Sequence, residues 1–392
     1  MREVFVAGIG ITSFTRLEYP LVEIAAYPGL MALRDSGLKR VDHLYVANMG
    51  AGRINEQTGL ASAVVDHLSL TPAGAETIEN GPASGASAIK QGYMAIASGM
   101  HDVVMVIGAE RMREVNALEA TDFVATLTHP LAEYVYGVTL PSLAGMFARL
   151  YMEKYGVTSR HMAMVAVKNH KNALDNFYAH LHEDITIEGI LDSPEASTNN
   201  PFVADPLRFY DVCPVSDGGA CVILATGDVM KKLNKPMVRL AGIGQATDTH
   251  AVHERKDPTE LLAVREAARQ SFAMAGVKPE DVDVAELHDA FTILEIAESE
   301  EVGFFKKGEG HRALERGETK IGGRIPINPS GGLKAKGHPV GATGVGQAHE
   351  IVLQLRGEGR KRQVKNARIG FTCNFGGFGN NVVCLTFIRE RS

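Results

Sequence analysis

The sequence has little cysteine, and none of it lies in the first half of the chain. Among 392 residues there are four cysteines, Cys213, Cys221, Cys373 and Cys384. No two of them form a Cys-x-x-Cys pair, so the pattern argues against both a zinc site and a disulfide framework. We therefore expect no metal. Any chemistry that requires a thiol must draw it from the second half of the chain.

The chain also lacks a strong charge of either sign and any long hydrophobic run. Its net charge is −6, its sequence pI is about 6.2, and its basic residues are scattered except in the stretch "RGEGRKRQVKNAR". Nucleic acid is therefore not indicated as a partner. No apolar run is long enough to cross a bilayer, and the first residues, "MREVFVAGIGITSF", lack the charged-then-apolar layout of a signal peptide. We expect a cytoplasmic protein that does not bind a membrane.

What the sequence does contain is an internal repeat. The stretch "REVFVAGIGITSF" and the stretch "KPMVRLAGIGQATDT", which begins at Lys235, are both β-rich runs ending in Gly-Ile-Gly, which predicts a strand turning into a loop. Each is followed by an apolar-periodic helix, the first one interrupted by Pro28, and then by a strand that begins with Val-Asp. Later, "SGASAIKQGYMAIASG" and "GATGVGQAHEIVLQLRG" both predict a helix that opens on small residues and leads into a buried strand.

This repeat predicts an α/β protein built of two layered halves. With 45% hydrophobic residues the chain can bury a large core, and the duplicated strand-helix alternation indicates mixed sheets whose central helices meet. We assign residues 1–115 and 201–234 to the amino-terminal half and residues 235–392 to the carboxyl-terminal half. Residues 116–200, rich in His, Met and Tyr, fit neither copy and are predicted to form a loop domain that covers a site.

Three segments of the second half carry residues suited to catalysis. In "NPSGGLKAKGHPVGATG", His338 follows a Gly-rich turn just before a helix start, where its imidazole can face a ligand. In "ELHDAF", His288 lies at a strand end, and we interpret Asp289 as the cap of the following helix. In "GFTCNFGGFGNN", Cys373 precedes glycines, and the backbone N–H groups there, those of Phe375 and Gly376, are of the kind that binds an oxyanion.

Taken together, the motifs "HDAF", "GGLKAKGHPVGATG" and "CNFGG" resemble those of the thiolase superfamily, closest to archaeal acetoacetyl-CoA thiolases and the sterol-carrier-protein type. The resemblance covers essentially the whole chain. It implies the duplicated, five-layered α-β-α-β-α thiolase fold with an inserted loop domain, and coenzyme A thioesters as substrates with no separate cofactor. It also implies a homodimer or a dimer of dimers, and a small partner built from a zinc ribbon and an OB fold.

The resemblance also implies roles for three side chains. His338, together with a water held by His288, would polarise the thioester oxygen, and Cys373 would act as acid and base at the substrate α-carbon. The sequence does not indicate which residues contact coenzyme A.

One position departs from the family. Thiolases carry the acyl-accepting cysteine in a Cys-Ala-Ser-Gly context at the start of the first central helix, and this chain has Pro82 there, which removes both the thiol and a backbone N–H donor. Proline suits the first helical position, so we expect the fold to be kept. Ser84 and Ser87 are weak replacements, because a serine nucleophile needs an adjacent base. A reactive thiol brought to this helix start from a distant loop would overturn this interpretation.

We therefore predict an enzyme that makes or breaks a carbon-carbon bond of an acyl-CoA through an enolate, in an aldol or retro-aldol sense. This chemistry needs no covalent acyl-enzyme. Two alternatives stay open from the sequence: an acetyl-CoA C-acetyltransferase that uses Cys373, and a catalytically silent subunit of a complex.

Overall fold

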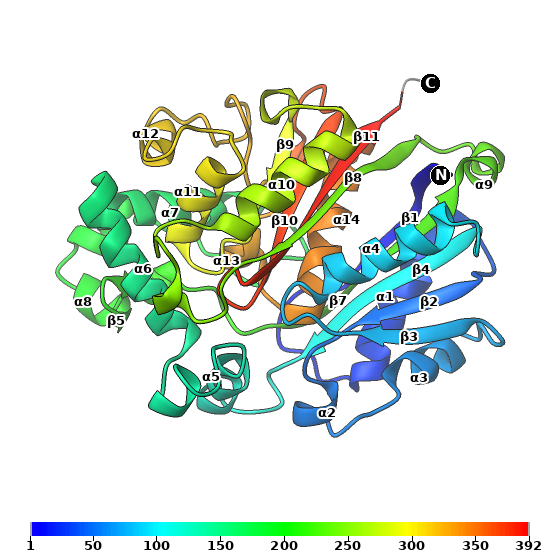
Figure 1. Ribbon diagram of the computed structural model, residues 1–392, viewed down its shortest axis with the longest axis horizontal. Helices are drawn as coiled ribbons and strands as arrows, with labels where there is room; N and C mark the ends of the chain where they lie inside the picture. Colours follow the sequence, from blue (N-terminus) through cyan, green and yellow to red (C-terminus); the bar gives the residue numbers. More distant parts are fainter. Residues whose placement is uncertain (1, 391–392) are drawn as a thin grey trace.

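The strands form one mixed sheet in which two halves repeat the same order. The protein is described by a computed structural model that covers residues 2–390. Within these residues, nine strands lie in the order β3-β2-β4-β7-β1-β8-β11-β10-β9 (Figure 1). The strands of the first half are β1 (Val4–Ile11), β2 (His43–Ala47), β3 (Gly74–Ile78), β4 (Val103–Arg111) and β7 (Asp217–Thr226). Those of the second half are β8 (Val238–Thr247), β9 (Val284–Glu286), β10 (Ile369–Gly376) and β11 (Asn381–Arg389).

The two halves pair in the same way. In the first half, β1, β7 and β4 are antiparallel neighbours, and β2 and β3 add to them in parallel. In the second half, β8, β11 and β10 are antiparallel and β9 is parallel to β10. Ile327 makes an isolated parallel bridge to Ala285 of β9, in the place that β3 takes beside β2. Phe5 of β1 and Arg239 of β8 form the register pair between the halves. The predicted duplication is confirmed.

Helices complete a five-layered α-β-α-β-α arrangement. Helices α1 (Leu21–Ser36) and α3 (Leu60–His67) pack on the outer face of the first half-sheet, and α10 (Leu262–Ala275) packs on β8 and β11. Between the half-sheets lie the central helices α4 (Ser84–Ala97) and α14 (Thr343–Arg356), which contact each other and strands of both halves (Figure 1). The predicted fold class is confirmed, and the two central helices bring residues of both halves to one place.

The Gly-Ile-Gly motifs lie inside strands rather than at their ends. Gly8 and Gly10 are in β1, and Gly242 and Gly244 are in β8. A Cβ at Gly8 or Gly10 would collide with backbone oxygens of α1, and a Cβ at Gly242 or Gly244 would collide with backbone oxygens of α10. The prediction that each strand turns into a loop at this motif is therefore wrong. These glycines allow a helix to lie directly on the strand in each half.

Pro28 does not interrupt the first helix. Helix α1 continues from Leu21 to Ser36 and ends at Gly37, whose φ of 76° is the left-handed conformation of a helix C-cap. Proline cannot donate to the carbonyl of Ile24, which lies instead against Gly219 of β7. Because Gly219 has no side chain, β7 leaves room for this carbonyl, and the helix continues past Pro28.

Most of the remaining helices come from the part of the sequence between β4 and β7. They are α5 (Ala117–Ala125), α6 (Leu140–Tyr155), α7 (Ser159–Leu174) and α8 (Ala196–Asn199), followed by the small hairpin of β5 (Phe202–Ala204) and β6 (Leu207–Arg208). In Figure 1 they gather on the left, beside α11 (Thr292–Glu301), α12 (Gly310–Glu315) and α13 (Gly332–Lys336). The short helices α2 (Ala51–Ile54) and α9 (Gly227–Leu233) belong to the first half. The exact boundaries of the loop domain stay a prediction.

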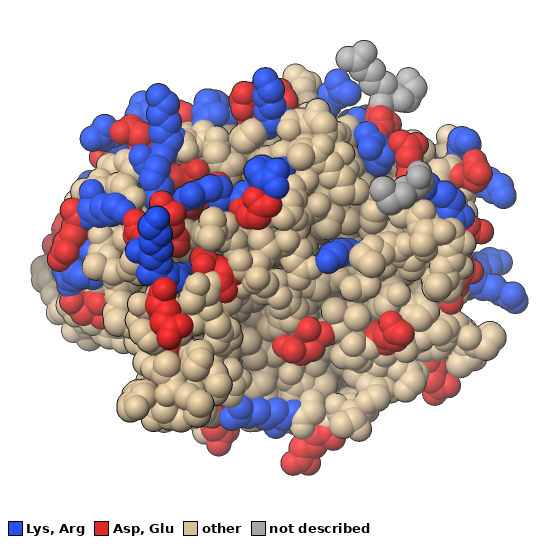
Figure 2. Space-filling view, in the orientation of Figure 1, with Lys and Arg blue, Asp and Glu red and all other residues tan. Residues whose placement is uncertain are grey.

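The surface carries charges of both signs. Figure 2 shows Lys and Arg interspersed with Asp and Glu on the face viewed. Among residues 2–390, no helix combines the length and the apolar character that crossing a membrane requires.

Candidate active site

A small, mostly apolar cavity lies where the two halves and the loop region meet. Its volume is about 130 Å³. The residues that line it include Pro82 from the turn before α4, His288 from the loop after β9, His338 from the loop before α14 and Phe375 from β10. Four of the residues predicted from sequence are therefore brought together, although more than 250 positions separate Pro82 from His338 in the chain.

His288 presents a hydrogen-bond donor to this cavity. The backbone N–H of Phe375 donates to His288 Nδ1 at 3.4 Å, and Asn374 Nδ2 lies 3.3 Å from the same nitrogen. The imidazole also stacks on the Phe375 ring, with centroids 5.1 Å apart and planes 6° from parallel. Because Nδ1 accepts, the proton of the neutral ring is on Nε2. No partner for Nε2 is found among the described residues.

His338 has the opposite arrangement. Its Nδ1 lies 2.7 Å from Thr343 Oγ1, and the Thr343 hydroxyl donates to the carbonyl of Pro339 at 3.0 Å. Because the hydroxyl hydrogen of Thr343 is used in this bond, its Oγ1 acts as the acceptor for Nδ1–H of His338. Nε2 of His338 then carries a lone pair, and within residues 2–390 it too has no hydrogen-bond partner.

The two imidazoles face each other and stay neutral. Their ring centroids are 5.0 Å apart at an interplanar angle of 86°. Burial, aided by the nearby charge of Lys336, lowers the pKa of His338 to about 3. Burial and the neighbouring His338 hold the pKa of His288 well below its usual value. One ring therefore supplies an N–H donor and the other a nitrogen lone pair in the same apolar cavity.

Pro82 precedes the helix instead of beginning it. The first residue of α4 is Ser84 and its N-cap is Ala83, so the expected first helical position is wrong by two residues. The N–H of Ala83 donates to the carbonyl of Asn80 at 3.0 Å, and the N–H of Ser84 donates to the carbonyl of Gly81 at 3.0 Å. This turn places Pro82 in the cavity wall, and proline supplies neither a backbone N–H donor nor a nucleophile.

Neither serine of the helix start takes over the missing role. The Ser84 hydroxyl donates to the carbonyl of Gly81 and accepts from the N–H of Asn80. The Ser87 hydroxyl accepts from Asn80 Nδ2 at 2.9 Å. Both are buried and neither lines the cavity, so both hold the turn together.

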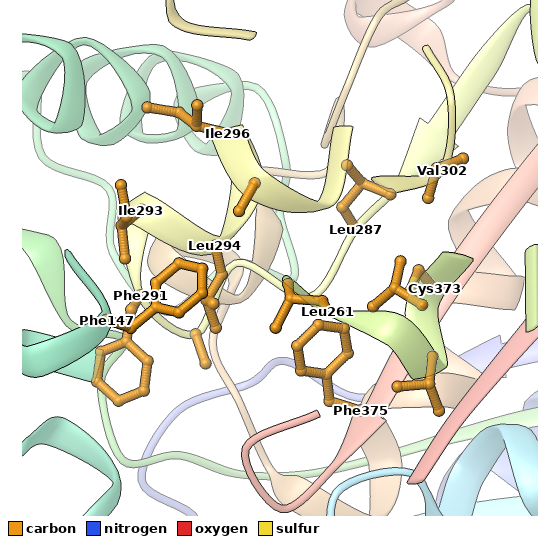
Figure 3. Close-up of a cluster of buried hydrophobic side chains, with 14 of the residues drawn as sticks. Phe147, Leu261, Leu287, Phe291, Ile293, Leu294, Ile296, Val302, Cys373 and Phe375 are labelled. Atoms are coloured by element: carbon orange, nitrogen blue, oxygen red, sulfur yellow. The ribbon is translucent and has the colours of Figure 1, made fainter. Parts of the chain in front are cut away.

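Cys373 does not reach the cavity. It lies opposite Cys384 in the β10–β11 ladder, and Figure 3 shows it among the apolar side chains of Leu261, Leu287 and Val302. Burial, together with the hydrogen bond to Cys384, raises the pKa of its thiol well above the usual range. Side chains alternate along a strand, so this thiol lies on the same face of β10 as Phe375, whose ring stacks on His288. Cys373 does not line the cavity, but its thiol lies against Glu298, which accepts from the backbone N–H of His288 at 2.9 Å. The role expected for Cys373 stays a prediction.

The expected oxyanion donors are also arranged differently. The N–H of Phe375 is used to orient His288, as described above. Gly376 is the last residue of β10, opposite Asn381, and does not line the cavity, whereas Gly377 does. The glycine turn thus brings its backbone close to the cavity one residue later than predicted.

Asp289 caps a helix, but not the one that follows it. The N-cap of α11 is Phe291, and no side chain caps that helix. The Asp289 carboxylate instead accepts from the N–H groups of Leu333 and Lys334, at 2.6 and 3.3 Å, in the first turn of α13. Asp289 therefore fixes the segment that leads to His338, a long-range contact that local sequence cannot indicate.

Cys213 is a wall residue that the sequence did not single out. It lines the same cavity as Pro82 and His338, from the loop before β7, and its N–H donates to the carbonyl of Ala290 at 2.9 Å. Burial raises the pKa of its thiol to about 12, so the group is a protonated thiol at neutral pH and not a reactive thiolate. Its position directly before the stretch "PVSDGG" is the feature of the sequence from which its place in the site could have been predicted. Thr343 could similarly have been noticed as the only hydroxyl in "GHPVGATG".

No metal centre is evident around the histidines. Across residues 2–390, no group of three or more His, Cys, Asp or Glu side chains is arranged to hold a metal ion.

Comparison with known proteins places the whole chain in one family. Residues 12–228 match the family model "Thiolase, N-terminal domain", and residues 244–389 match "Thiolase C-terminal domain-like". The chain is 43% identical to the acetyl-CoA acetyltransferase of Methanothermobacter thermautotrophicus, over 99% of this chain and 100% of that one, and 37% identical to that of Methanocaldococcus jannaschii, over 100% of both. Among solved structures, the Ltp2-ChsH2(DUF35) aldolase superposes with a TM-score of 0.83 at 25% identity, over 100% of this chain and 98% of that one.

These relatives and the assembled cavity agree with the motifs of the sequence. Both family models match in the expected order, and the structure places the residues of the "HDAF" and "GHPVGATG" motifs against one cavity. The chain belongs to the thiolase superfamily and is an enzyme of that superfamily that acts on acyl-CoA thioesters.

Proposed function

We propose that this enzyme makes or breaks a carbon-carbon bond next to the carbonyl of an acyl-CoA thioester, through an enolate and without an acyl-enzyme. One observation carries the proposal. Pro82 lines the same cavity as two neutral histidines, one with an N–H donor and one with a lone pair. Two groups suited to enolate chemistry thus line the cavity, whereas the turn before α4 offers proline in place of a nucleophile, and both observations support the proposal.

The two histidines account for the chemistry in the cleavage direction. His338 Nε2 accepts the proton of a hydroxyl group on the β-carbon while the bond between the α- and β-carbons breaks. The electron pair of that bond passes to the thioester oxygen, and His288 Nε2–H donates to the resulting enolate oxygen. The His338 imidazolium then returns the proton to the α-carbon, which releases an acyl-CoA and an aldehyde or ketone. Bond formation is the reverse sequence.

Proton exchange at the α-carbon tests this proposal. An acyl-CoA incubated with the enzyme in D₂O should acquire deuterium at its α-carbon, as followed by mass spectrometry. The variant H338A should lose the exchange, and C373A should keep it, because the Cys373 thiol lies in the core. The absence of exchange in the wild type, in a preparation that binds acyl-CoA, would favour a catalytically silent subunit.

A second candidate is acyl transfer, favoured by the place of Cys213 in the cavity wall and by the name acetyl-CoA acetyltransferase given to the archaeal relatives. Intact-mass measurement after incubation with acetyl-CoA or acetoacetyl-CoA separates the two. The enolate proposal expects an unmodified chain. An acetyl group on Cys213 that turns over would establish acyl transfer and overturn the proposal.

We also propose an assembly and a setting for the enzyme. A homodimer with a small zinc-ribbon and OB-fold subunit is proposed, supported by the aldolase neighbour, whose name, Ltp2-ChsH2(DUF35), joins two components. We further propose that the enzyme works in the cytoplasm with no cofactor besides its coenzyme A thioester. Co-purification from the native host, followed by mass determination of the complex, tests the assembly, and recovery of a lone homodimer would count against the small subunit.

A further inference from the structure

A second, larger cavity adjoins the active site. Its volume is about 770 Å³, and residues 212–215, with Ala120, line both cavities. Ser216 ties the two sides together, because its Oγ accepts from the backbone N–H of His338 at 3.3 Å and lies 2.8 Å from Nδ1 of His180, which lines the second cavity. The second cavity is therefore next to the reacting histidines.

A buried ammonium group that makes no direct ion pair lines this second cavity. Lys334 is only 2% exposed, and within residues 2–390 its Nζ makes no hydrogen bond or ion pair. Nζ lies 5.8 Å from the centroid of the Tyr210 ring, which also lines the cavity. By contrast, the buried Lys168 pairs with Glu295, and the buried Lys336 pairs with Glu286. A buried charge is costly unless it is paired, so Lys334 is placed to receive an anion from outside the chain.

The other charges around the cavity leave an excess of positive charge. Glu183 accepts a hydrogen bond from the Tyr210 hydroxyl at 3.0 Å, and Glu114 pairs with Arg111 at 3.1 Å. Arg113 also lines the cavity, and its guanidinium makes no ion pair within residues 2–390. Glu114 is thus ion-paired outside the cavity and Glu183 is hydrogen-bonded to a neutral hydroxyl, whereas Lys334 and Arg113 make no ion pair within residues 2–390.

We propose that the second cavity binds a carboxylate carried by the acyl part of the substrate, with Lys334 as its counter-ion. This inference rests on the proposed function, since it assumes that an acyl-CoA reacts beside His288 and His338. The phosphates of coenzyme A are separated from the thioester by the whole pantetheine arm, whereas Lys334 lies beside the wall of the reaction cavity. A carboxylate on the acyl side reaches this place, and the substrate class is accordingly a dicarboxylic acid bound to coenzyme A through one end.

Equilibrium binding tests this without turnover. Glutaryl-, adipyl- and pimelyl-CoA are each compared with the neutral acyl-CoA of the same chain length, by isothermal titration calorimetry, in the wild type, in K334M and in K320M. Lys320 is an exposed lysine and serves as the matched control. For at least one chain length, the wild type should bind the carboxylated ligand about tenfold to a hundredfold more tightly than K334M does, as expected for a charge-assisted hydrogen bond. Binding of the neutral ligands should be the same in all three proteins.

Three other results would each overturn the inference. Equal loss of both ligand types in K334M would mean that Lys334 contacts the coenzyme A phosphates. No loss would mean that the cavity does not bind the carboxylate. A smaller assembly mass for K334M by light scattering would mean that Lys334 pairs with a carboxylate of another chain. The proposed function is judged separately, because α-carbon exchange is measured with a neutral acyl-CoA.

Discussion

Replacing Lys334 with methionine should stabilise the ligand-free enzyme. Methionine has a similar volume and length and carries no charge, so K334M keeps the packing and removes the buried ammonium. Burial lowers the pKa of Lys334 from 10.5 to about 8, and a difference of that size corresponds to about 3 kcal/mol of unfavourable free energy in the folded state. We expect the variant to recover about 1 to 3 kcal/mol at pH 7, seen as a rise of a few degrees in the thermal midpoint.

The pH dependence gives the sign of the effect. The groups that face Lys334 and partly offset the burial are Cys213, Asp211, Asp289 and Glu183. Below pH 8 the lysine is protonated in both the folded and the unfolded chain, so the full cost is present. Between pH 8 and 10.5 the unfolded chain binds more protons, and the cost falls as pH rises. The thermal midpoint of K334M should therefore exceed that of the wild type most at pH 7 and approach it near pH 10.5.

Differential scanning calorimetry at pH 7, 8, 9 and 10, with K320M as control, measures this difference. A midpoint of K334M below that of the wild type at every pH would refute the reasoning, because the lysine would then have a stabilising partner within the chain. A difference that does not change with pH would refute it as well. A bound carboxylate should raise the midpoint of the wild type but not that of K334M.

The remaining predictions concern the reaction cavity. The variant H288A should slow α-carbon exchange by about a hundredfold to a thousandfold, the usual cost of one oxyanion donor, and measured exchange rates that stay within threefold of the wild type would contradict the assignment. T343V should remove the acceptor that fixes the His338 proton and slow exchange about tenfold or more, with substrate affinity unchanged in a binding titration. C373A should leave exchange intact yet cost about 1 to 2 kcal/mol of stability through a small core void, and a large loss of exchange in a folded variant would restore Cys373 to catalysis. In the wild type the exchange rate should show no midpoint near pH 6.5, because burial keeps the pKa of His338 at about 3.

The overall architecture could be predicted from the sequence, because the evidence for it is repeated. Each half carries the same succession of strand, helix, glycine stop and strand, and both copies fold into the same strand order. The helix ends at Gly37 and Gly276 were also readable, since both take the left-handed conformation that ends a helix. The Gly-Ile-Gly motifs were misinterpreted because close approach of a helix and a loop turn both call for glycine.

The site was only partly predictable. His288, His338 and Pro82 were found from motifs, and the structure brings them to one cavity. Whether the Cys373 thiol reaches the cavity depends on the side chains that pack around it from distant segments, which a motif does not contain. The unpaired state of Lys334 depends on which carboxylates come near it from distant segments, so it becomes visible only in three dimensions.

The reaction cavity is shared between the two copies of the repeat. Pro82 comes from the amino-terminal copy and both histidines come from the carboxyl-terminal copy, while α4 and α14 hold the copies in contact. Asn374 of the second copy accepts the N–H of Ala86 in the first at 3.4 Å and also approaches His288. Neither copy expressed by itself would possess a working centre, so slight separation of the central helices would silence the enzyme while every catalytic side chain remained chemically intact.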